Sequence, residues 1–240
     1  MLTLAIEISN PTAQHAAPGV AIGILSPAAP PNILGLEPIA PSARHDDDLM
    51  PAIDRLTRRL GLTPRDLQAV AVSVGPGGYT ALRIAVATGT MIAHATEAKP
   101  IAVPSALAAS HALDPSISGT IGVALASKNE TAVIARFRVD HGATPHPIDL
   151  PGEVRTAESL AGLGLTHLAA DQFLPETFVH AAANIGIQRV ALRLDPIAVL
   201  RAASWLINQT SDASTLPPLA PLYLREPDAV TLWRKRHPAT

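Results

Sequence analysis

The sequence predicts an α/β fold in which mixed β-sheets are flanked by helices. First, short runs of branched apolar residues alternate with longer segments whose apolar residues recur at helical spacing. Second, a strand, a glycine-rich turn, a helix and another strand follow one another between residues 67 and 103, as in a β-α-β unit. Third, the second half repeats this plan loosely, which indicates two similar α/β units.

The first half is expected to open with a β-meander. Residues 2–9, 19–25 and 33–38 have the branched or alternating character of strands. A proline-rich turn is predicted at residues 27–31, between the last two strands.

A helix is predicted next, because apolar residues recur at helical spacing from Leu49 to Leu60. The three aspartates at 46–48 suit the positive end of a helix dipole. Pro51 fits a first turn, where its missing N–H would have had no partner. Gly61 ends the helix.

The remaining elements follow from the same signals. The β-α-β unit is expected to have strands at 67–74 and 101–103 and a helix at about 80–96. The second half is expected to have strands at 120–126, 131–139, 168–170 and 190–194, helices at 176–184 and 196–208, and loops at 142–152 and from 211 onward. We therefore predict an N-terminal domain at 1–106 and a second, more divergent domain at 107–240.

Composition limits the classes of function. With 48% apolar and 16% charged residues, the 240-residue chain is expected to be folded and globular. A protein that binds nucleic acid by itself normally has a basic surplus, because phosphate neutralisation dominates the affinity. The net charge here is −2, so if the chain serves an RNA pathway, another protein is expected to carry the RNA. The absence of cysteine excludes disulfides, thiolate metal sites and a cysteine nucleophile.

Targeting signals are also not expected. The first residues lack the basic segment of a secretory signal and meet a carboxylate at Glu7. The longest weakly polar stretch, 81–98, contains Arg83, His94 and Glu97, which are poorly suited to a membrane span. A cytoplasmic protein without membrane contact is the expectation.

The strongest local signal is the turn that contains Gly75, Gly77 and Gly78, between a strand and a helix. Such a turn offers backbone N–H groups and a positive helix end, which suit an anion or nucleotide. No lysine follows the glycines and their spacing is not that of dinucleotide-binding proteins, so a tight packing turn is the simpler interpretation. Glu7, at the end of the first strand, is the other candidate nucleotide contact, and its alternative is a solvated strand end.

A stripe of small residues on the helix after this turn is a candidate interface. Ala81, Ala85, Gly89 and Ala93 are spaced by four, which lets another helix approach closely. Gly89 costs about 1 kcal/mol of helix propensity relative to alanine, so it needs a packing reason. The sequence does not decide whether the neighbouring helix belongs to the same chain or to another subunit.

Other polar clusters give no assignment. His45 precedes the three aspartates, but successive helical residues point in different directions and the position four residues on is Leu49. A charged helix start is therefore preferred to a metal site. No serine, histidine and acid constellation can be placed from spacing, so no catalytic residue is assigned. The basic tail, Arg234–His237, is interpreted as a terminal charge run.

Together these segments resemble the TsaB (YeaZ) family of tRNA threonylcarbamoyladenosine biosynthesis proteins, which is related to TsaD. The resemblance rests on Glu7–Asn10, on His45–Asp54 with its internal proline, and on Gly75–Ala85. Val103–Leu107 and Pro221–Arg225 match two shorter family segments. The match is clear in the first half of the chain and weak in the middle of the second.

The resemblance implies a duplicated actin-like (ribonuclease H-like) fold and a role in transferring threonylcarbamoyl to adenosine 37 of tRNA. In the catalytic relative TsaD, two histidines four residues apart bind the metal. The corresponding positions here are His45 and Leu49, so the second ligand is missing. Glu7 replaces the usual aspartate and Ser9-Asn10 replaces a pair of hydroxyl residues, as expected of a partner subunit that does not itself catalyse the reaction.

The resemblance therefore implies a non-catalytic scaffold for a TsaD-like catalytic subunit, with a TsaE-like ATPase as a further partner. ATP and metal are expected on TsaD, and none is expected to bind this chain independently. Family members pair with themselves or with TsaD through two N-terminal helices, which implies a homodimer and an interface at the small-residue stripe, Ile53 and Leu56. The alternative is a metal- or ATP-dependent enzyme of the same superfamily, a glycoprotease-like peptidase or a transferase, which activity of the isolated chain would reveal.

Overall fold

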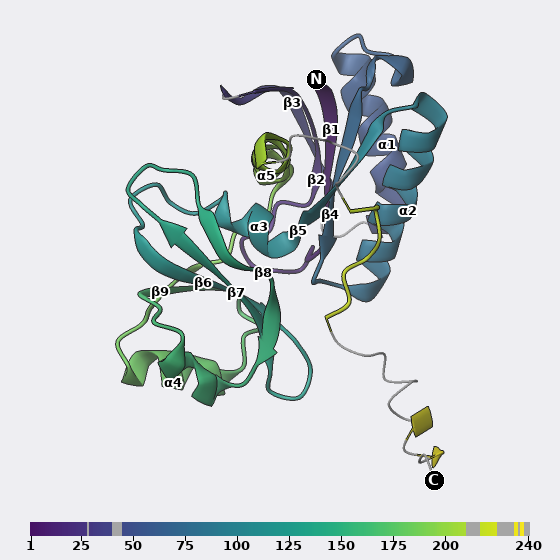
Figure 1. Cartoon of the computed structure of the whole chain (residues 1–240). Helices are drawn as coiled ribbons and strands as arrows, with labels where there is room; N and C mark the ends of the chain where they lie inside the picture. Colours follow the sequence, from purple (N-terminus) through teal and green to yellow (C-terminus); the bar gives the residue numbers. More distant parts are fainter. Residues whose placement is uncertain (28, 40–44, 210–216, 225–232, 235, 238–240) are drawn as a thin grey trace.

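The computed structural model of the 240-residue chain describes residues 1–27, 29–39, 45–209, 217–224, 233–234 and 236–237 (Figure 1). Its first sheet has the order β3-β2-β1-β4-β5. These strands are β1 (Leu2–Glu7), β2 (Gly19–Ser26), β3 (Ala29–Pro38), β4 (Ala69–Gly75) and β5 (Lys99–Pro104). The second sheet, in the order β10-β9-β6-β7-β8, has β6 (Gly119–Ala126), β7 (Ala132–Val139), β8 (His146–Arg155), β9 (His167–Ala170) and β10 (Gln188–Ala191).

Helices connect and cover the strands. The α-helices are α1 (His45–Arg59), α2 (Tyr79–Thr96), α3 (Ser105–Ser110), α4 (Glu176–Asn184) and α5 (Pro196–Gln209), and the 3-10 helices are η1 (Pro64–Asp66) and η2 (Ala157–Gly162).

The two sheets have the same internal plan. In the first sheet β1 is antiparallel to β2 and parallel to β4, and in the second β6 is antiparallel to β7 and parallel to β9. In each, an antiparallel meander of three strands is extended by two parallel strands. Short turns suffice for the meander, whereas the parallel strands need helical crossovers. The predicted α/β class with duplicated mixed sheets is confirmed.

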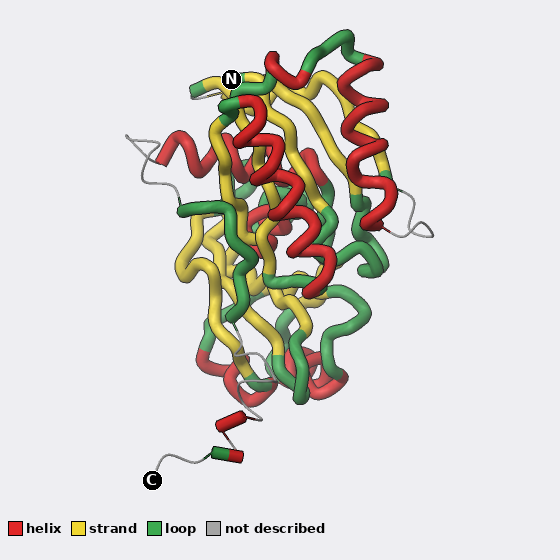
Figure 2. Tube along the Cα trace, turned by 90° about the vertical axis from the view of Figure 1, so that its right-hand side faces the viewer, coloured by secondary structure: helices red, strands yellow, loops and turns green. Residues whose placement is uncertain are grey.

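The elements stack in five layers (Figures 1 and 2). α1 and α2 cover the outer face of the first sheet, and Figure 2 looks onto them. α3 and α5 lie between the sheets, where one apolar cluster joins Ala5 and Ala71 of the first sheet to Phe137 of the second. α4 and η2 cover the outer face of the second sheet.

The end of the chain returns to the first sheet. α5 follows the second sheet in sequence but packs against all five strands of the first. Residues 217–224, which we call the C-terminal strap, also return, because Leu222 N–H donates to Val74 O at 2.7 Å and Leu219 packs on the α1–α2 cluster. The division at residues 106 and 107 remains a prediction, and the described residues of the second segment contribute to both halves.

Three elements differ from the sequence-based expectations. β3 begins at Ala29, so Pro30 and Pro31, which were predicted to lie in a turn, belong to the strand. The predicted loop at 142–152 is wrong, because β8 runs from His146 to Arg155 and includes Pro147 and Pro151. Among the described strands, β8 lies at the edge of its sheet and pairs with β7, and an edge strand tolerates proline because one of its sides has no ladder partner. The short helix α3 was not predicted. All six of its residues are buried between the sheets.

Candidate functional site: the glycine turn and the end of the first strand

Glu7, the last residue of β1, points into the protein core. Its side chain is 1% exposed, and Oε1 accepts hydrogen bonds from N–H and Oγ of Ser9, both at 2.6 Å. Oε2 is buried and has no hydrogen-bond partner among the described residues. Burial raises the pKa of Glu7 against the opposing effect of hydrogen bonds from Ser9 and Ser73, and the charge of Asp195 raises it further. The solvated strand end expected as the alternative for Glu7 is therefore wrong.

The glycine turn packs directly on the residues that follow β1. Gly78 N–H donates to Ser9 O at 2.7 Å, and Asn10 Nδ2 donates to Pro76 O at 3.3 Å. A Cβ on Gly77 would collide with the same Ser9 carbonyl oxygen. Gly77 is thus explained by the close approach of two main chains, and Gly78 N–H is already used. This geometry favours the tight-turn interpretation.

The C-terminal strap closes the other side of the turn. Gly75 has φ +105, which favours glycine, and a Cβ there would lie 2.7 Å from Leu82 Cδ1 and 3.3 Å from Leu222 O. Figure 1 shows the strap in yellow beside α2. The turn is therefore enclosed by β1, α2 and the strap.

An aromatic contact attaches the strap to the start of α2. The rings of Tyr79 and Tyr223 stack with centroids 5.4 Å apart and planes at 27°. The guanidinium carbon of Arg83 lies 5.3 Å from the Tyr79 ring centroid, and Arg83 also donates to the Tyr79 hydroxyl at 3.1 Å. Offset stacking and cation–π contacts each stabilise such an arrangement by about 1 kcal/mol.

The small-residue stripe faces the protein's own sheet. Ala85, Gly89 and Ala93 are buried, and a Cβ on Gly89 would lie 2.5 Å from Val72 Cγ2 of β4. Ala81 is half-buried against the same core. Small residues are needed here because α2 lies close to a strand rather than to a helix of another molecule. The prediction that the stripe is an intersubunit surface is wrong for Ala85, Gly89 and Ala93, which are buried within the chain.

The two interface residues predicted on α1 are buried as well. Ile53 is 6% exposed and Leu56 is 0% exposed, and both pack on the first sheet. The outer side of this layer presents other side chains: Met50 of α1 is 54% exposed and Met91 of α2 is 70% exposed. The periodicity of the sequence distinguished the two sides of each helix, but the interface was predicted on the side that packs on the sheet.

The loop after β1 also contacts the second half of the protein. Gln172 accepts from Gln14 N–H at 2.8 Å and donates to Thr12 O at 2.9 Å. Ala17 N–H donates to Leu194 O at 2.8 Å. Spacing in the sequence gave no signal for Gln172, because the contact joins residues 158 and 160 positions apart. These hydrogen bonds connect the two halves of the protein.

Among the described residues, no group of three or more histidine, aspartate or glutamate side chains gathers as a metal site. The side chains of His45, Asp46 and Asp47 lie outside the described part. Asp48 pairs with Arg55 at 3.1 Å, and Arg55 also pairs with Glu37 of β3 at 2.7 Å. Asp48 thus helps to fasten α1 to the sheet edge.

Comparison with known proteins assigns the chain to a family. Residues 25–180 match the family TsaD: tRNA N6-adenosine threonylcarbamoyltransferase. The chain belongs to this family. The family assignment covers β3 to α4 and so includes the glycine turn and most of both sheets.

Solved structures show the same fold as this TsaD-family chain. A Pseudomonas aeruginosa protein described as similar to peptidase YEAZ has a TM-score of 0.64 at 18% identity, and YeaZ from Pseudomonas aeruginosa has 0.61 at 16%. Each comparison covers 93% of this chain and 99% of the other. No curated protein sequence matches. The expected resemblance in fold is confirmed, and none of the described helices has the length and apolar character needed to cross a membrane.

Proposed function

We propose that this chain is a TsaB-like, non-catalytic subunit that supports a TsaD-like enzyme in transferring threonylcarbamoyl to adenosine 37 of tRNA. Membership of the TsaD family supports the pathway. The fold shared with YeaZ along 99% of that chain supports the accessory role. The observation that carries the proposal is the enclosed glycine turn beside a buried Glu7.

Nucleotide chemistry at such a turn would need open N–H groups and an ionised carboxylate within reach of a metal. Here Gly78 N–H is bonded to Ser9 O, and the carboxyl group of Glu7 lies in the core with a raised pKa. We therefore propose that ATP and metal bind to the TsaD-like subunit, with a TsaE-like ATPase as its expected further partner. With a net charge of −2, the chain is expected to contact tRNA only through the complex.

The outer side of the α1–α2 layer is the proposed contact for the partner subunit. Met50 and Met91 are large, exposed and apolar, and methionine side chains adapt readily to another surface. The same layer is the proposed contact in a homodimer, so the homodimer and the complex with TsaD would exclude each other. This replaces the buried stripe as the candidate interface.

Binding to a purified TsaD-like subunit of the same organism tests the proposal. Met91→Glu should weaken the complex, because it places a charge in a buried apolar contact. Ile185→Glu is the matched control, since Ile185 is 47% exposed but lies beyond α4 on the second half. Equal binding by both variants and the parent chain would contradict this contact surface.

The alternative is an enzyme that acts without a partner. The observation that favours this alternative is Glu7 Oε2, because a buried oxygen without a partner is a candidate acceptor for a hydrogen bond from a substrate. Hydrolysis of ATP or peptide by the isolated chain, abolished by Glu7→Gln, would support that alternative.

A further inference from the structure

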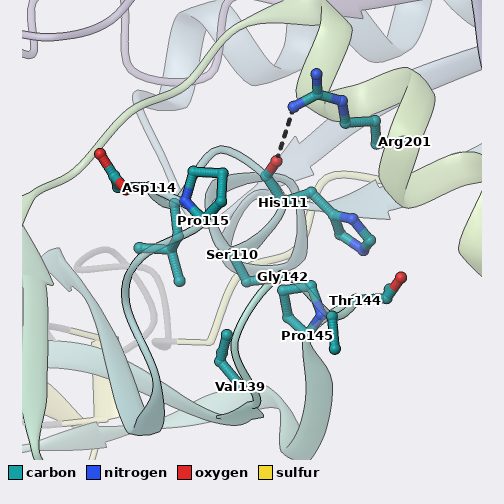
Figure 3. A pocket seen from close by; sticks show the side chains of 11 residues that line it. Ser110, His111, Asp114, Pro115, Val139, Gly142, Thr144, Pro145 and Arg201 are labelled. Carbon is teal, nitrogen blue, oxygen red and sulfur yellow. Dashed lines mark hydrogen bonds between the residues drawn. The ribbon is translucent and has the colours of Figure 1, made fainter.

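A small cavity lies away from the glycine turn, where the two halves of the protein meet (Figure 3). Its volume is about 230 Å³. One wall is the end of α3 with Ser110 and His111, a second is Arg201 of α5, and a third is the β7–β8 connection with Thr144 and Pro145. Because liquid water occupies about 30 Å³ per molecule, the cavity suits a small metabolite rather than a nucleotide.

Arg201 supplies the positive charge of the cavity. Its guanidinium donates one long hydrogen bond, 3.3 Å, to the main-chain oxygen of His111 (Figure 3). A guanidinium carries five N–H donors in a planar fork that matches a carboxylate. Arg201 is exposed, so its donors can be reached from solution.

His111 lines the cavity beside Arg201 and adds no charge to it. Burial, and then the charge of Arg201, lower its pKa to about 4, so its imidazole is uncharged at neutral pH. Its Nε2 is buried without a hydrogen-bond partner in the described part of the chain. Arg201 is therefore the cationic group of the lining that a ligand would meet.

The remaining walls limit the kind of anion. Leu113, Val139 and Pro145 are apolar, so they favour a short carbon chain over a fully hydrated inorganic ion. Asp114 is the acidic residue of the lining, and its carboxylate accepts from N–H and Oγ of Ser116 at 2.9 and 2.7 Å. Figure 3 shows Asp114 on the opposite side of the cavity from Arg201.

We propose that this cavity binds a small organic carboxylate, with the carboxylate on Arg201 and the carbon chain against Leu113, Val139 and Pro145. The ligand would join α3 and α5, which pack on the first sheet, to the β7–β8 connection of the second. It would therefore stabilise the arrangement of the two halves. This binding site is independent of the scaffold function proposed above.

The test is a titration of the whole chain with propionate at constant ionic strength, followed by amide NMR shifts. Saturable shifts confined to residues 110–115, 139–145 and α5 are expected, with an affinity of about 1 mM. Inorganic phosphate should bind more weakly than propionate, because it has no carbon chain to pack against the apolar walls. Equal or tighter binding of phosphate would overturn the assignment to a carboxylate.

Arg201 variants give the second part of the test. Arg201→Gln should weaken propionate binding about tenfold, which is the effect of losing one charge-assisted contact. The affinity of Arg201→Lys for propionate should lie between those of the parent chain and Arg201→Gln. Arg189→Gln, an exposed change on β10, is the control. Unfolding temperatures show whether each variant is folded. Shifts that do not saturate, or equal affinity in folded Arg201→Gln, would overturn the proposal.

Discussion

Replacing Gly89 by alanine tests how α2 packs. A new Cβ would lie 2.5 Å from Cγ2 of Val72, which is 0% exposed on β4 between two other strands. Alanine gains about 1 kcal/mol of helix propensity, and overpacking a buried contact costs about 1–3 kcal/mol. Because β4 and α2 are both held in the core, we expect a net destabilisation of about 1 kcal/mol, or a melting temperature lower by about 2–4 °C.

Urea and thermal unfolding of the Gly89→Ala chain measure this effect. Val72→Ala should relieve the contact, so the double variant should be more stable than the sum of the single changes predicts. Gly162→Ala is the matched control, because no atom lies within 4 Å of its Cβ position. The reasoning would be refuted if Gly89→Ala raised the stability of the folded chain by the full gain in helix propensity and also disrupted an oligomer. The Gly89 side of α2 would then contact another subunit.

Three further changes address the glycine turn. Because the pKa of Glu7 is raised, its contribution to stability is full below the ordinary pKa of 4.5 and is lost as pH rises through the folded-state pKa. In urea titrations, the free energy of unfolding should therefore fall above pH 4.5, and Glu7→Gln should make this fall smaller. An unchanged pH dependence in Glu7→Gln would contradict this prediction. Gly77→Ala should lower the unfolding free energy by about 1–3 kcal/mol, because its Cβ meets the main-chain oxygen of Ser9, and a neutral effect would show that the turn can open. Tyr223→Ala should remove about 1 kcal/mol of stacking on Tyr79 and speed proteolysis of the C-terminal strap, whereas unchanged cleavage would show that other contacts hold it.

Local signals in the sequence were sufficient for much of the first half. Branched strands, the charged start of α1 and the glycine turn each depend on neighbours in the sequence, and all were predicted close to where they lie. β8 was missed because proline usually ends a strand, and only its position at a sheet edge makes Pro147 and Pro151 acceptable.

The contacts of the candidate site were harder to predict. Spacing by four showed that something approaches Gly89 closely, but spacing does not distinguish a strand from a helix of another subunit. Burial raises the pKa of Glu7, and Ser73 of β4 and Asp195 before α5, both distant in sequence, also influence it. The carboxyl group was recognised as a candidate, while its raised pKa and its enclosure could be recognised only in the assembled sheet.

The most direct test of the scaffold role is threonylcarbamoyladenosine formation on tRNA by the purified components. The TsaD-like subunit with its ATP-dependent partners should require this chain, the chain alone should form no product, and a folded Glu7→Gln chain should support the reaction fully. Product formed by the chain without TsaD, or loss of the reaction in folded Glu7→Gln, would contradict the account.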